Sequence, residues 1–203
     1  VYRYDGGTNW TRRGGLSGLV ADTSQIVEGP NLGVFQNTLY GVITPWIFGG
    51  GGITKPAIVK KLNGDAWLPA GPDTGLNANS GTEAVNIELA VYGDALYAIW
   101  QEQSGGVSAI RVKKTAGDGN WSDANNGMQL NVSLQNGTSP KLSVYGDSLY
   151  ALWIEGNQVR AASYTAAQPA EPVAGLVWAP GSAAGTTKLA GVSGDPILKD
   201  AIG

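Results

Sequence analysis

Two segments of the chain carry the same three kinds of side chain, and these could together bind a sugar. The first contains Trp100, Glu102 and Arg111, and the second contains Trp153, Glu155 and Arg160. An indole face can pack against the apolar C–H side of a pyranose, while carboxylate and guanidinium groups can make paired hydrogen bonds to neighbouring hydroxyls. The chemistry of these residues therefore predicts a ligand-binding site in each segment.

Both segments have the pattern of β-strands. Alternation along residues 96–102 places Trp100 and Glu102 on one face of a strand. Arg111 lies on the next expected strand, which a hairpin would pair with the first. The same residues also allow a structural interpretation, because a Trp can be part of the core and a Glu opposite an Arg can form a cross-strand ion pair.

The composition excludes several kinds of chemistry. The 203 residues include 31 Gly but no Cys and no His, which removes thiol catalysis, Ser-His-Asp triads, and thiolate or imidazole metal sites. We therefore predict no catalytic residue, no cofactor and no metal site. The net charge is -3 and the charged residues are scattered, so the sequence has no basic cluster of the kind that binds nucleic acid. No apolar run is long enough to insert into a membrane.

A repeat of about 50 residues organises the chain. The segment ELAVYGDALYAIWQE at 88–102 matches KLSVYGDSLYALWIE at 141–155, and weaker copies begin at residues 31 and 188. Each unit predicts four short strands, the fourth of which lies around a Trp that we interpret as a packing residue; these are Trp10, Trp67, Trp121 and Trp178. Four short strands repeating at this period are typical of β-propeller blades.

The repeats predict a single all-β domain, a β-propeller of about four four-stranded antiparallel blades. Full blades cover about 31–82, 83–137 and 138–186, and one further blade is split between 1–30 and 187–203. Pairing the N- and C-terminal strands would close the ring and remove exposed sheet edges. Two alternatives stay open: the chain is a fragment of a larger ring, or two chains form a homodimer with eight blades.

The segments VYRYDGGTNW and NGTSPKLSVYGDSLYALWIEGNQVRAA resemble tandem repeats of secreted or surface microbial β-propeller proteins and, more distantly, propeller lectins. The resemblance implies a propeller fold and a secreted or cell-surface location. The turn TAGDGNW occupies the hairpin of a sialidase Asp box but lacks the full Ser-x-Asp-x-Gly-x-x-Trp pattern. This departure argues against a sialidase.

We predict on these grounds a lectin-like propeller without enzymatic activity. Its partners would be glycans or glycoproteins, bound weakly at several sites of one rigid ring. Two other functions stay open. One is a structural or protein-interaction repeat module in which every Trp belongs to the core, and the other is an enzyme that acts on polysaccharides.

Overall fold

The computed structural model describes residues 1–13, 19, 25–49, 52–132, 135–165 and 179–180. The regular elements in this part of the chain are all β-strands. The described residues thus include no helix that could span a membrane. The prediction of an all-β fold is confirmed.

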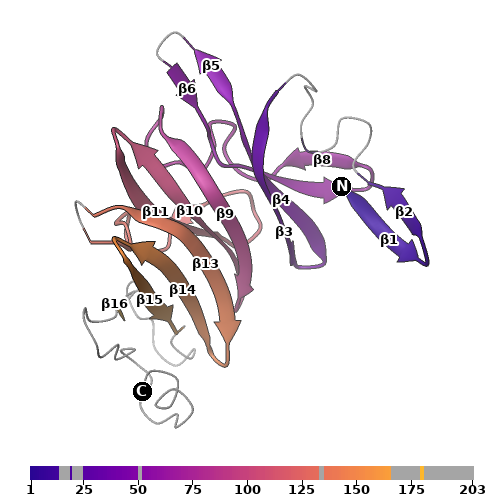
Figure 1. Ribbon diagram of the computed structural model, residues 1–203. Helices are drawn as coiled ribbons and strands as arrows, with labels where there is room; N and C mark the ends of the chain where they lie inside the picture. Colours follow the sequence, from indigo (N-terminus) through magenta and orange to yellow (C-terminus); the bar gives the residue numbers. More distant parts are fainter. Residues whose placement is uncertain (14–18, 20–24, 50–51, 133–134, 166–178, 181–203) are drawn as a thin grey trace.

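Three four-stranded antiparallel sheets form the body of the molecule (Figure 1), and each follows the order of the sequence. The first contains β3 (Val27–Phe35), β4 (Thr38–Pro45), β7 (Ile58–Asn63) and β8 (Ala66–Pro69). The second contains β9 (Glu83–Tyr92), β10 (Ala95–Ser104), β11 (Val107–Thr115) and β12 (Ser122–Asp123). The third contains β13 (Gly137–Tyr145), β14 (Ser148–Glu155), β15 (Gln158–Tyr164) and β16 (Ala179–Pro180). These are the four-stranded blades that the repeat predicts.

Two smaller hairpins complete the described structure. β1 (Tyr2–Gly6) pairs with β2 (Asn9–Arg12), and β5 (Ile47–Gly49) pairs with β6 (Gly52–Thr54). The first hairpin corresponds to the N-terminal half of the predicted split blade. The strands expected at 187–203, which would close the ring, lie outside the described residues, as does Trp178.

Turn residues that tolerate a positive φ separate the strands. Gln36 and Asn37, between β3 and β4, have φ of 48° and 58°. Two consecutive residues with positive φ form a type I′ turn, whose backbone twist matches that of the two strands it connects. The equivalent turns of the next two sheets use Gly93 and Gly146, with φ of 59° and 55°.

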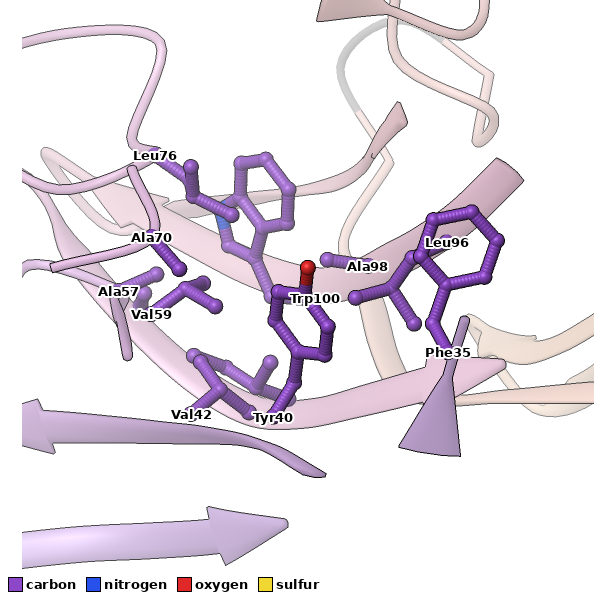
Figure 2. Packing of buried hydrophobic residues seen from close by; sticks show 12 residues of the cluster. Phe35, Tyr40, Val42, Ala57, Val59, Ala70, Leu76, Leu96, Ala98 and Trp100 are labelled. Carbon is purple, nitrogen blue, oxygen red and sulfur yellow. The ribbon is translucent and has the colours of Figure 1, made fainter. Parts of the chain in front are cut away.

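The strand β10 is buried on both faces because it belongs to the middle one of the three sheets. Trp100 lies in the apolar cluster between the first two sheets, close to Val59 and Leu76 (Figure 2). Its neighbour Ile99 points the other way, into the cluster that Leu149 and Trp153 share between the second and third sheets. Successive strand residues face opposite sides, so a single strand supplies both cores.

The first strands of the three sheets converge. β9 contacts β3 on one side and β13 on the other. In a propeller the blades surround a central channel. The converging strands β3, β9 and β13 are therefore the ones that line the channel, and we refer to them below as the inner strands.

Candidate functional site

The Trp and Glu residues that the sequence analysis singled out do meet, but inside the protein. Trp100 is 0% exposed, and its Nε1 donates a hydrogen bond of 3.1 Å to Oε2 of the buried Glu102. In the third sheet the Nε1 of Trp153 donates in the same way to Glu155, at 3.0 Å. The alternation that placed each Trp and Glu on one strand face is thus correct.

Each of the two carboxylates also holds the segment that leads into its own sheet. Glu102 accepts from the backbone N–H groups of Ala78 and Asn79 at 3.0 and 3.2 Å, and from the hydroxyl of Thr82 at 2.9 Å. Glu155 accepts from the N–H of Val132 at 3.1 Å. These hydrogen bonds satisfy buried polar groups and fasten the connections between sheets.

The arginines stand across from the tryptophans without joining the carboxylates. Arg111 is the register partner of Trp100, and Arg160 is that of Trp153. Arg111 donates from Nη1 to the carbonyl oxygen of Gly127 at 2.8 Å. In the part of the chain that the structure describes, neither arginine forms an ion pair with the Glu of its own sheet. A ligand-binding role for the six residues stays a prediction.

A different place in the fold has the shape of a site. A cavity of about 400 Å³ lies where the inner strands converge, and its wall is made by residues 29–31 of β3, 86–88 of β9 and 139–141 of β13. The three segments occupy the same position in the repeat. Each of the three blades therefore contributes three residues to the cavity wall.

A β-bulge shapes each of the three wall segments. In every inner strand the register with the second strand shifts at this point, so that two residues lie opposite one. The first bulged residue is left-handed in all three strands: Gly29, Asn86 and Ser139 have φ of 58°, 55° and 53°. Bulges reorient side chains and are frequent beside active sites, and non-glycine residues in this conformation are strained.

A tryptophan lies directly behind two of the three bulges, and Ile43 lies behind the third. Trp100 occupies the position opposite the bulge of β9, between the register partners of Val85 and Glu88, and Trp153 occupies the equivalent position in the third sheet. The motif that the sequence analysis singled out therefore supports the cavity wall from the protein interior.

Polar side chains link the wall segments around the cavity. The Oδ1 of Asn31 accepts from the N–H of Leu89 at 3.2 Å, and the Oε2 of Glu88 accepts from the N–H of Leu142 at 3.4 Å. The Nζ of Lys141 donates to the other carboxylate oxygen of Glu88. Asn31, Glu88 and Lys141 are equivalent in the repeat, so one position supplies an amide, a carboxylate and an ammonium group.

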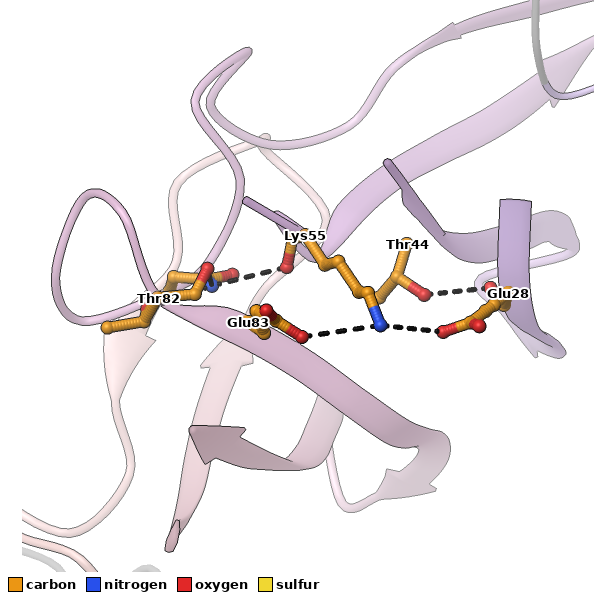
Figure 3. Close-up of polar contacts among 6 residues, drawn as sticks. Glu28, Thr44, Lys55, Thr82 and Glu83 are labelled. Atoms are coloured by element: carbon orange, nitrogen blue, oxygen red, sulfur yellow. Dashed lines mark hydrogen bonds and ion pairs between the residues drawn. The ribbon is translucent and has the colours of Figure 1, made fainter. Parts of the chain in front are cut away.

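A second polar cluster lies at the same end of the inner strands (Figure 3). The Nζ of Lys55 lies 3.2 Å from Oε2 of Glu28, which precedes the cavity residue Gly29, and 3.3 Å from Oε2 of Glu83, the first residue of β9. These two carboxylate oxygens are therefore no more than about 6.5 Å apart. Burial alone would lower the pKa of Lys55, but the hydrogen bonds and charges of both glutamates outweigh burial and raise it.

The sequence analysis missed both clusters. The only signal for the wall residues is the polar position before Leu in NLGVF, ELAVY and KLSVY, whose chemistry changes from blade to blade. The second cluster depends on the connection after β6, which has no counterpart in the other repeats. Among the described residues, no group of three or more His, Cys, Asp or Glu side chains could hold a metal ion.

Comparison with known proteins identifies the fold. The α-L-arabinofuranosidase of Fusarium graminearum, solved with an iminosugar inhibitor, has a TM-score of 0.51 at 13% identity; the likeness covers 71% of this chain and 47% of that one. A single-site mutant of the same enzyme gives a TM-score of 0.50 at 13% identity with the same coverage. A glycosyl hydrolase from Bacteroides ovatus has a TM-score of 0.47 at 13% identity, covering 69% of this chain and 46% of that one.

The two likenesses with TM-scores of 0.51 and 0.50 confirm the β-propeller fold. The chain spans about half the length of the solved structures it matches. No protein-family model matches the chain, and no curated protein is similar to it in sequence. The resemblance to propeller proteins therefore holds for the fold, whereas its lectin component has no support.

The comparison also corrects the function that the sequence suggested. The two solved structures above with a TM-score of at least 0.50 are both of an α-L-arabinofuranosidase. This finding contradicts two predictions, that of a non-catalytic, lectin-like protein and that of a protein without enzymatic activity, and we count both as wrong. The absence of His carried too much weight, because glycoside hydrolysis can proceed with carboxylates alone.

Proposed function

We propose that the chain is part of a propeller enzyme that processes carbohydrate, and that the cavity between the inner strands is its substrate site. The observation that carries this proposal is the composition of the cavity wall. Three bulged strands supply an amide, a carboxylate and an ammonium group at one level, from Asn31, Glu88 and Lys141. The comparison with carbohydrate-cleaving enzymes of the same fold supports it.

The wall suits a sugar because its accessible side chains are polar. Hydroxyl groups can exchange hydrogen bonds with Asn31, Ser139 and Lys141, while the side chains of Ile87 and Pro140 are buried behind them. The charges of Glu88 and Lys141 compensate each other, which favours a neutral ligand. A volume of about 400 Å³ falls in the usual range of small-molecule sites.

Glu88 is the carboxylate of the wall, and we assign it the role of facing the anomeric carbon. There a carboxylate can stabilise the positive charge that develops as the glycosidic bond breaks. Most glycosidases need a second carboxyl group, roughly 5–10 Å from the first. Glu28, which precedes the cavity residue Gly29, is our candidate for that group.

Turnover of a panel of 4-nitrophenyl glycosides, including the α-L-arabinofuranoside and the β-mannoside, tests the proposal. Glu88→Gln should lower kcat/KM at least about 100-fold, since it removes the charge but keeps an oxygen that can accept from the N–H of Leu142. The matched control is Asp73→Asn, which removes a carboxylate from an exposed position outside the cavity. Equal activity of Glu88→Gln and wild type would contradict the proposal.

A second candidate is a structural or protein-interaction repeat module. The burial of Trp100 and Trp153 favours it, because it accounts for both residues through packing alone. This candidate predicts that neither the wild-type protein nor Glu88→Gln turns over any glycoside of the panel.

A further inference from the structure

The first sheet carries an element that the other two lack. Its second and third strands, β4 and β7, are connected through the additional hairpin β5–β6 (Figure 1). In the second and third sheets the same connection is a tight turn, at 105–106 and 156–157. The connection between the second and third strands lies at the end of the sheet where the inner strand begins, which is also the end that holds the cavity.

One face of this hairpin is apolar and open to solvent. Phe48 and Ile53 are register partners, so their side chains share a face, and they are 66% and 38% exposed. Trp46 precedes Phe48 by two residues, and their ring centroids are 6.1 Å apart. A two-stranded hairpin has little stability of its own, and its exposed aromatic surface is available for contact with a ligand.

Lys55 fixes the base of the hairpin beside the cavity. Its Nζ lies 4.3 Å from the centroid of the Trp46 ring while it pairs with Glu28 and Glu83. Its carbonyl oxygen accepts from the N–H of Ala84 at 2.7 Å, which attaches the backbone to the start of β9. The contacts form one continuous strip from the two carboxylates through the ammonium and indole groups to the phenyl ring of Phe48.

We infer that this strip, from Glu28 and Glu83 to Phe48, is a further subsite that holds a neighbouring sugar unit of an oligosaccharide whose end occupies the cavity. The inference rests on the proposed function, because it places this unit on a substrate of the same site. The side chains of Glu28 and Glu83 are 44% and 33% exposed, so their oxygens can accept from hydroxyls while Phe48 packs on a C–H face. Carboxylates beside the aromatic rings favour a polyhydroxylated ligand over an apolar protein surface.

Affinity electrophoresis in gels containing soluble arabinan, mannan or starch measures this binding without requiring turnover. The wild-type protein should be retarded by at least one polysaccharide, and Phe48→Ala should bind it about tenfold more weakly, whereas Phe48→Trp should retain binding. The control is Val159→Ala, which truncates a 74% exposed side chain on β15 of another sheet. Circular dichroism verifies that each variant is folded.

Two results would overturn the inference: retardation of Phe48→Ala equal to that of wild type, or no retardation of wild type by any of the three polysaccharides. In the second case, pull-down of a protein by wild type but not by Phe48→Ala would assign the face to a protein partner. The turnover assay tests the proposed function separately from this binding assay. Glu88→Gln should lose turnover and still be retarded. Retardation of the wild-type protein without turnover by the wild-type protein would reject the enzymatic proposal but not the binding of sugar at the hairpin.

Discussion

Trp100 donates its indole N–H to the carboxylate of Glu102, two residues further along β10, and neither side chain reaches solvent. The same carboxylate accepts from two backbone N–H groups and from the hydroxyl of Thr82. A single buried anion thus fixes the indole behind the cavity wall and the loop that precedes β9.

Replacing Glu102 with Gln should destabilise the protein by about 1–3 kcal/mol, because the NH₂ group of Gln cannot accept the hydrogen bonds that the second carboxylate oxygen receives. Urea unfolding followed by tryptophan fluorescence gives the free energy of unfolding. The isosteric change Asp73→Asn, at an exposed position, serves as the control. Equal stability of Glu102→Gln and wild type would show that the carboxylate is dispensable for the fold.

Trp100→Ala should cost about 3–5 kcal/mol, the usual range for removing a large buried aromatic side chain. Trp10→Ala provides the comparison, since Trp10 is 62% exposed on β2 and should change stability by no more than about 0.5 kcal/mol. Thermal and urea unfolding of the two variants measure the difference. Similar losses from both would contradict the burial of Trp100.

Stability should decline at alkaline pH because of Tyr97. Burial, together with the neighbouring Tyr164, Tyr92 and Asp94, raises the pKa of this phenol well above its ordinary value of 10.0. A raised pKa in the folded state contributes stability that is complete below about pH 10 and is lost above it, as the phenol of the unfolded chain ionises. Tyr97→Phe should therefore flatten the fall in stability between about pH 10 and 12, measured by urea unfolding at each pH; an unchanged slope would contradict the assignment.

Gly29→Ala should destabilise the protein by about 1 kcal/mol or more through backbone strain. Gly29 has a φ of 58°, and a Cβ there would meet nothing closer than the hydroxyl of Thr44 at 3.7 Å, so steric overlap does not contribute. Differential scanning calorimetry measures the change. The comparison variant is Gly49→Ala, at a glycine without a positive φ and with open space where the added methyl group would lie. An equal effect of both changes would show that the bulge conformation is not what requires glycine.

The sequence predicted the blades well because their pattern is local. Alternation along β10 correctly placed Trp100 and Glu102 on one face, and the glycine and asparagine turns marked the hairpins. Trp121, predicted as a packing residue, packs on the first core cluster and donates to the carbonyl oxygen of Ala70 at 2.7 Å. Trp10 differs, since it is exposed in the described structure.

The cavity could not be predicted in the same way. Its wall combines segments more than 50 residues apart, which only the convergence of three sheets brings together. A bulge also inserts one residue into a strand, so simple alternation assigns the wrong face to the residues that follow it. Asn tolerates a left-handed backbone without requiring it, and Ser seldom adopts one, so the residue types at Asn86 and Ser139 do not predict this conformation.

The repeated bulge keeps backbone geometry and side-chain chemistry independent of each other. The three inner strands bend alike at Gly29, Asn86 and Ser139, yet the residue two positions later is neutral, acidic or basic. Each of these positions can therefore change without a change in the bulge that precedes it. For protein engineering, Asn31, Glu88 and Lys141 form a compact combinatorial library on a constant scaffold, and for evolution they offer a route to new ligand preferences by single substitutions.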